Sequence, residues 1–173
     1  KPCIGTREQI GLPMGLNMFE LLPFWHTFFT SLGFGIALSE KSSRELYVEG
    51  QHTIPSDTVC YPAKLLHGHI ESLINQGVKD IFYPCMSYNL NEDLGDNYYN
   101  CPVVAYYSEL LAGNMDIKQG TKLLYPYLNI NSPRILAKTL GECLEETFGK
   151  FSSHQLMRAV KHGFKCYNGY MQA

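Results

Sequence analysis

The chain has 173 residues, of which 45% are hydrophobic and 17% are charged, which is typical of one globular domain and excludes a disordered or collagen-like chain. Its formal net charge is −2, and its scattered Lys and Arg residues lack the basic stripe that nucleic acid binding requires. The most apolar stretch, residues 21–38, is interrupted by Pro23 and His26 and is too polar to span a membrane.

Strand and helix patterns alternate in the first third of the chain. A short buried strand is predicted at residues 9–13, a helix at 16–32 and a second strand at 34–38. Ser42 and Glu45 then have the spacing of a capping box, so a short helix is expected to follow. This order gives the unit strand, helix, strand, helix.

The most distinct element is a helix over residues 62–75, where apolar residues repeat every 3.6 positions between a proline in the first turn and a glycine after the end. Later runs of apolar residues predict strands at 79–84, 101–106 and 122–125. Serine caps predict two final helices, one over 133–148 after Ser132 and one from Ser152 or Ser153 to about Tyr167.

Because each parallel strand connection needs a crossover, this alternation predicts a mainly parallel sheet with helices on both faces. We therefore expect an α/β, Rossmann-like three-layer domain over residues 10–173, preceded by a lead-in or linker at 1–9. Residues 1–9 lack the apolar core of a signal peptide. We expect a cytoplasmic protein whose cysteines are reduced and available as thiols.

Three cysteines fall near the carboxyl ends of predicted strands or at a helix start, where open parallel sheets bind ligands. Cys85 directly follows a strand, Cys101 lies in the next loop-to-strand segment, and Cys60 immediately precedes the helix 62–75. Backbone amides at a helix start favour a thiolate, which is the form that binds metals. Lys64 and His67 continue down the same side of that helix as Cys60.

Glycine at position 68 would allow a ligand to approach that helix closely, so Lys64, His67 and Gly68 are candidate cofactor contacts. His67 and His69 are two positions apart on a helix and point in different directions, so they are not expected to share an ion. We expect His69 to be partly buried and hydrogen-bonded, and His67 to face the site or the surface.

The spacing of Cys60, Cys85 and Cys101 contains no CxxC pair, so a zinc ribbon has little support. Three thiolates suit a cubane cluster with one iron left open, whereas cysteines that act as small buried hydrophobic residues are the ordinary alternative. A structural zinc site would need a fourth ligand, for which His67 is the nearest candidate.

Cys3 and two later cysteines are not assigned to the site. The chain lacks the glycine-rich motifs of dinucleotide- and ATP-binding proteins.

Several motifs then carry a resemblance that covers about residues 10–107. They are Ile10-Gly11-Leu12-Pro13 with Asn17-Met18 and Pro23-Phe24-Trp25, the run from Ile54 to His69, Phe82-Tyr83-Pro84-Cys85, and Asn100-Cys101-Pro102. On these residues the chain resembles the uncharacterised domain of long proteins of the CoA-substrate-specific activase type. That domain is similar to 2-hydroxyacyl-CoA dehydratase subunits and to double-cubane cluster proteins.

The resemblance implies that Cys60, Cys85 and Cys101 hold an iron–sulfur cluster of the 4Fe-4S type. It also implies an ATP-dependent activator domain, in the same or a partner chain, that delivers an electron for reductive chemistry, with an acyl-CoA as a candidate substrate. The chain has no ATPase segment, so it is expected to be a fragment of a longer multidomain protein and inactive in isolation. The alternatives are a non-catalytic binding or assembly module and a structural zinc site.

Overall fold

Four parallel strands form one sheet in the computed structural model, which describes residues 5–92, 95–115, 117 and 120–173. The strand order is β2-β1-β3-β4, with Gln9 of β1 opposite Gly35 of β2 and Ile10 opposite Asp80 of β3. The strands are β1 (Gln9–Leu12), β2 (Gly35–Leu38), β3 (Asp80–Phe82) and β4 (Lys122–Leu124). Cys3 lies outside the described residues.

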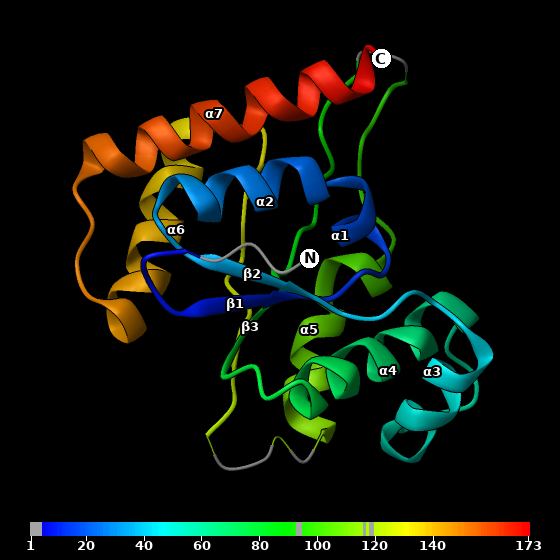
Figure 1. The fold of residues 1–173 in the computed structure, drawn as a ribbon. Coiled ribbons are helices and arrows are strands. Elements are labelled where there is room, and N and C mark those ends of the chain that lie inside the picture. Colours follow the sequence, from blue (N-terminus) through cyan, green and yellow to red (C-terminus); the bar gives the residue numbers. More distant parts are fainter. Residues whose placement is uncertain (1–4, 93–94, 116, 118–119) are drawn as a thin grey trace.

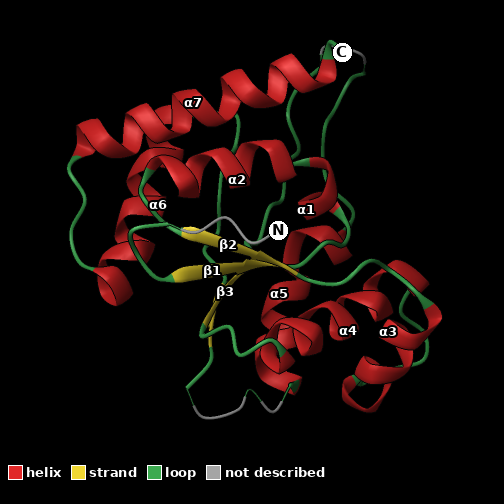
Figure 2. Cartoon of the chain, viewed as in Figure 1, coloured by secondary structure: helices red, strands yellow, loops and turns green. Residues whose placement is uncertain are grey.

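Helices cover both faces of this sheet, as Figures 1 and 2 show. The helices are α1 (Asn17–Glu20), α2 (Leu22–Ser31), α3 (Arg44–Gly50), α4 (Tyr61–Asn75), α5 (Pro102–Asn114), α6 (Pro133–Phe148) and α7 (Ser153–Met171). In Figure 1, α2 and α7 lie on one face of the sheet, and α4 and α5 lie on the other. The predicted α/β three-layer fold with a parallel sheet is therefore confirmed.

The core on the α2 face is built from aromatic side chains. Trp25 and Phe29 of α2 both pack on Phe82 of β3, with ring centroids 4.9 Å apart in each pair. Strands covered on both faces are expected to be apolar throughout, and Ile10, Leu12 and Phe82 are indeed fully buried. The aromatic run of α2 thus belongs to the core.

Two predicted elements differ from the structure. The helix predicted over 16–32 is divided into α1 and α2 at Leu21, because Pro23 suits the first turn of a new helix. The strand predicted over 101–106 is wrong, since these residues lead into and begin α5. Ser43, rather than Ser42, caps α3 by accepting a hydrogen bond from the amide of Leu46 (3.1 Å).

The strand order indicates at which edge of the sheet a ligand would bind. The chain moves from β1 to β2 on one side and then crosses through α4 to β3 on the other side of β1. The carboxyl ends of β1 and β3 therefore flank the point where the order reverses, and open α/β sheets bind ligands there. Because α4 and α5 are crossover helices between parallel strands, their N-termini return from this same edge.

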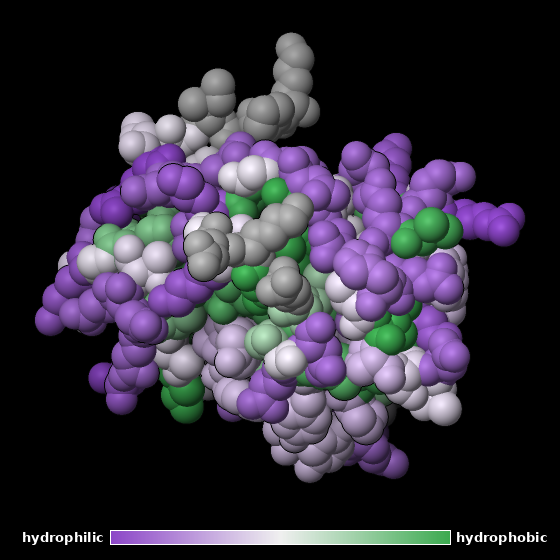
Figure 3. Space-filling model, turned by 90° about the horizontal axis from the view of Figure 1, so that it is seen from below, coloured by the Kyte–Doolittle hydropathy of each residue, from purple (hydrophilic) through white to green (hydrophobic). Residues whose placement is uncertain are grey.

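The surface of the molecule carries mostly polar side chains in the view from below, with smaller apolar areas between them (Figure 3). Within the described ranges, no helix combines the length and the apolar character needed to cross a membrane.

A serine cap of α7 gives the first testable prediction. Ser152 Oγ accepts a hydrogen bond from the amide of Gln155 (3.2 Å), and the Gln155 side chain accepts one from the amide of Ser152 (3.0 Å). Ser152→Ala should therefore lower the free energy of unfolding by about 1 kcal/mol, measured by urea denaturation. Ser132 occupies the same position before α6 but makes no capping hydrogen bond with the described residues. Ser132→Ala is the matched control, and an equal loss there would contradict the prediction.

Candidate functional site

The predicted cysteines Cys60 and Cys101 occupy equivalent places at the starts of two helices. Cys60 is the N-cap of α4 with φ −62° and ψ 153°, and Cys101 is the N-cap of α5 with φ −63° and ψ 156°. Each carbonyl accepts the first helical hydrogen bond, from the amide of Lys64 (3.1 Å) and of Ala105 (3.0 Å). Both residues are exposed and their thiols are free, so each helix start presents an uncommitted sulfur atom.

Cys85 lies just beyond the end of β3 and is held firmly by its backbone. Its amide donates to the carbonyl of Pro126 (3.0 Å), and its carbonyl accepts from the amide of Leu128 (2.9 Å). Its sulfur is buried and lies 2.9 Å from the hydroxyl of Ser108 in α5. Burial raises the pKa of the Cys85 thiol, and the hydrogen bond with Ser108 partly offsets this rise. The free Cys85 is therefore held as a thiol.

Two hydrogen bonds join the elements that carry the three cysteines, one between Cys85 and Ser108 of α5 and one between Tyr107 of α5 and His67 of α4. Tyr83 is fully buried, and its pKa is raised first by burial and then by the charges of Cys85, Tyr107 and Cys101. Burial raises the pKa of Tyr107 to about 12, with a further contribution from Cys60. We call Cys60, Cys85, Cys101, Tyr83 and Tyr107 the cysteine site.

The hydroxyl of Tyr83 is buried and has no hydrogen-bond partner among the residues that the structure describes. Buried hydroxyl groups are nearly always hydrogen-bonded, so an exception calls for a partner that is not part of the protein or for a functional reason. The amides of Tyr83 and Cys85 donate to the carbonyls of Leu124 and Pro126 in one continuous parallel pairing, so the two side chains lie on the same side of the strand and this hydroxyl belongs to the cysteine site. The site therefore contains three free thiols and one uncommitted hydroxyl.

His67 is buried in α4 and supports the site from behind Tyr107. Thr53 Oγ1 donates to the carbonyl of Gly50 (2.8 Å), so it accepts from His67 Nδ1 (2.7 Å). His67 Nε2 is then the acceptor for the hydroxyl of Tyr107 (2.9 Å). Burial, with a smaller effect of His52, lowers the pKa of His67 to about 4, so the ring is neutral near pH 7.

His67 is therefore not on the surface. It contacts the site indirectly, through its hydrogen bond with Tyr107. Both of its ring nitrogens are already used, so binding a metal would break one of the two hydrogen bonds. The proposed fourth ligand of a zinc site is thus committed elsewhere.

The other two predicted cofactor contacts have structural partners. Lys64 Nζ donates to the carbonyl of Asp57 (2.8 Å) and fixes the segment before α4 onto its first turn. Gly68 is buried where α4 crosses α3, and a Cβ there would overlap the carbonyl of Leu46. The close approach that Gly68 permits in this structure is that of the α3 backbone.

His69 is a buried, hydrogen-bonded histidine, as predicted. Its Nδ1 lies 2.8 Å from Ser39 Oγ and its Nε2 lies 3.0 Å from Ser42 Oγ, and burial lowers its pKa to about 4. Its partners differ entirely from those of His67, so the two histidines do not converge on one ion. The serines also line an open, largely apolar cavity of about 540 Å³ at the ends of β1 and β2, with Met14, Phe19, Leu38 and Lys41.

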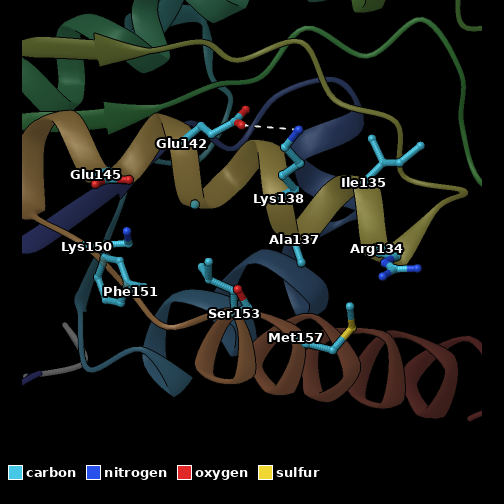
Figure 4. Close-up of a pocket in the computed structure, with 12 residues that line it drawn as sticks. Arg134, Ile135, Ala137, Lys138, Glu142, Glu145, Lys150, Phe151, Ser153 and Met157 are labelled. Carbon is cyan, nitrogen blue, oxygen red and sulfur yellow. Dashed lines mark ion pairs between the residues drawn. The ribbon is translucent and has the colours of Figure 1, made fainter.

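A further open cavity of about 520 Å³ lies between α6 and α7, on the other face of the sheet from α4 and α5. Figure 4 shows Lys138 and Glu142 of α6 facing each other at its edge, with their charged atoms 3.7 Å apart. Phe151 and Met157 supply apolar walls. No cysteine or histidine lines this cavity, so the cysteine site remains the candidate for metal chemistry.

Among the described residues, no group of three or more His, Cys, Asp or Glu side chains is placed to hold a metal ion. A single zinc ion requires all its ligand atoms within about 2.3 Å of the metal. The described residues do not form such a mononuclear site. An iron–sulfur cluster distributes its thiolate ligands over several iron atoms, and its sulfur atoms accept hydrogen bonds. Three thiols with an unpartnered buried hydroxyl fit the chemistry of such a cluster.

Sequence reasoning missed Tyr83, Tyr107 and Ser108. Tyr83 lies within the strand predicted at 79–84, and its place two residues before Cys85 at the strand end is the signal that indicates the site. Tyr107 and Ser108 were hidden by the wrong strand over 101–106. A helix from Pro102 would have placed Ser108, seven residues after Cys101, on the same face as Cys101, whereas Tyr107 is not at a spacing that indicates the site.

The comparisons with known proteins place the chain in a family. A family model described as the CoA enzyme activase uncharacterised domain (DUF2229) matches residues 9–173. No curated protein and no solved structure matches the chain. The match extends beyond residue 107, where the motifs of the resemblance end, and spans every described strand and helix. The chain therefore belongs to the family of the CoA enzyme activase uncharacterised domain.

Proposed function

We propose that this chain is the iron–sulfur cluster domain of a CoA enzyme activase-like system, with Cys60, Cys85 and Cys101 as cluster ligands. The observation that carries the proposal is the cysteine site itself. Two free thiols lie at helix N-caps, one thiol lies at a strand end, and the buried hydroxyl of Tyr83, two residues before that strand-end cysteine, has no partner among the described residues. Iron–sulfur clusters are held by cysteine thiolates, and helix N-termini favour anionic groups.

The roles of the protein residues follow from their positions. The exposed Cys60 and Cys101 would bind the cluster from the solvent side, and the buried Cys85 would bind it from the sheet. Ser108 would keep its hydrogen bond to the Cys85 sulfur and so orient it. When bound, the cluster supplies one-electron chemistry. An ATP-driven activator is the proposed electron donor, and an acyl-CoA thioester the proposed class of substrate, in a cytoplasmic protein.

The test is anaerobic reconstitution with iron and sulfide, followed by analysis of both elements and by the visible absorption spectrum. Wild-type protein should bind about four irons per chain. Cys60→Ala, Cys85→Ala and Cys101→Ala should each lose at least half of the iron and sulfide.

The matched controls are Cys143→Ala and Cys166→Ala, because these thiols lie on α6 and α7 and should not affect loading. If all three site variants retain the wild-type content of iron and sulfide, the proposal is wrong. Protein that binds zinc but no cluster would also contradict it. Circular dichroism of each variant separates lost ligands from lost fold.

A further inference from the structure

The cysteine site contains two tyrosine hydroxyl groups, of which one already donates a hydrogen bond and the other does not. The proton of Tyr107 is committed, because His67 Nε2 must accept it once Thr53 has fixed the tautomer of the ring. The oxygen of Tyr107 can therefore only accept a further hydrogen bond. The hydroxyl of Tyr83 has no partner in the described part of the chain, so its proton is free to be donated.

The position of Tyr83 shows what its hydroxyl faces. Tyr83 leaves the end of β3 two residues before Cys85, and its amide donates to the carbonyl of Leu124 (2.9 Å), which continues the pairing with β4. The side chain is fully buried and so has no access to bulk water as an alternative partner. The amide of Cys85 continues the same pairing by donating to the carbonyl of Pro126 (3.0 Å). Residues two apart in an extended strand point to the same side, so the phenol lies on the side of the Cys85 sulfur, a candidate cluster ligand.

We propose that Tyr83 is a positioning residue whose hydroxyl donates a hydrogen bond to a sulfur atom of the group held by Cys60, Cys85 and Cys101. This inference rests on the proposed function, because it requires that the cysteines hold a sulfur-containing cluster. Reduction adds negative charge to the cluster, so a hydrogen bond to its sulfur stabilises the reduced form more than the oxidised form. Tyr83 would thereby raise the reduction potential of the cluster.

The proposal makes opposite predictions for the protein without and with the cluster. Without it, the hydroxyl of Tyr83 is buried and unsatisfied, so Tyr83→Phe removes a destabilising group and leaves the ring in place. The variant should then melt about 2–4 °C higher than wild type. With the cluster, the same variant loses a hydrogen bond to the reduced state.

The experiment therefore measures two quantities on wild type, Tyr83→Phe and the control Tyr106→Phe. Tyr106 lies on α5 beside Tyr107 but is half exposed, so its hydroxyl is accessible to water. Thermal melting is measured on metal-free protein. Anaerobic redox titration of the reconstituted protein, followed by electron paramagnetic resonance, gives the midpoint potential.

For Tyr83→Phe we expect the reduction equilibrium to fall about tenfold, which for one electron is a shift of about 59 mV to more negative potential. Tyr106→Phe should match wild type in both measurements. An unchanged potential in a fully loaded Tyr83→Phe protein overturns the inference and leaves the cluster proposal standing. Failure of wild type to take up a cluster overturns the proposed function and this inference with it. If Tyr83→Phe without metal melts at or below wild type, the hydroxyl is already satisfied, and the inference is wrong.

Discussion

Gly68→Ala should destabilise the protein by about 3 kcal/mol, because α3 and α4 cross there with their backbones in contact. The added Cβ would overlap the carbonyl oxygen of Leu46 and lie 2.7 Å from its carbonyl carbon and 3.0 Å from its Cγ. Backbone atoms cannot rotate away as a flexible side chain can, so the two helices must move apart. This separation would also disturb His67, which adjoins Gly68 and holds Tyr107.

The measurement is urea denaturation followed by circular dichroism, with the midpoint and slope compared between variants. Gly113→Ala is the matched control, since Gly113 also lies within a helix, α5, and a Cβ there would meet nothing within 4 Å. That variant should be more stable than wild type by about 0.5–1 kcal/mol, because alanine favours the helix. The same glycine-to-alanine substitution is thus expected to lower the stability at position 68 and to raise it at position 113. Equal midpoints for Gly68→Ala and wild type would show that the crossing is not tightly packed.

Acid is expected to destabilise the protein well above the pH at which most carboxylates are protonated. Burial lowers the pKa of both His67 and His69 to about 4, from 6.5 for an exposed histidine. Between these values the unfolded chain binds protons that the folded chain does not, so stability falls as the pH decreases from about 6.5 to about 4. Above pH 6.5 both states are neutral, and this contribution is constant.

Each histidine should remove about 2 kcal/mol of unfolding free energy between pH 7 and pH 5. Denaturant titrations at several pH values in this window would measure the loss. In His69→Gln the loss should be about half that of wild type, and in His154→Gln, whose exposed side chain lies on α7, it should be unchanged. Proton NMR titration of the folded wild type gives a direct check. If the imidazoles of His67 and His69 titrate near pH 6.5, the prediction is wrong.

Local sequence patterns were sufficient to predict α4, which begins after Cys60, and β3, which ends before Cys85. The apolar repeat between Pro62 and Gly77 marks α4 with its first turn and its end, and the structure has this helix at Tyr61–Asn75. The N-cap place of Cys60 follows directly from that pattern. The apolar run before Cys85 gave β3 for the same reason, because a strand buried on both faces has few polar residues.

Cys101 shows where local pattern fails. The following residues Val103, Val104 and Tyr106 favour strands, and the sequence alone therefore predicted one. In the structure, Ala105, Ser108 and Leu111 are buried at helical spacing against the rest of the protein, and α5 forms. Tertiary packing decides such segments, and the proline after Cys101 is compatible with either a loop or a helix start.

The convergence of Tyr83, Tyr107 and His67 could not be predicted from any local pattern. Tyr107 is 40 residues from His67 in the chain, yet their side chains share a hydrogen bond. Periodicity indicates which face of an element is buried, but it does not indicate which buried polar groups meet. The unpaired hydroxyl of Tyr83 is likewise a property of the packed interior and has no counterpart in the sequence.

The main chain is rigid at all three cysteines, and this matters for electron transfer at the proposed site. Each cysteine is followed closely by a proline in the first helical turn, and the ring of proline restricts the main chain to few alternatives. Cys85 is anchored on both sides by the sheet. Ligands on such stiff supports change position little when the charge of a bound group changes. The proposed cluster would therefore exchange electrons with a small reorganisation energy.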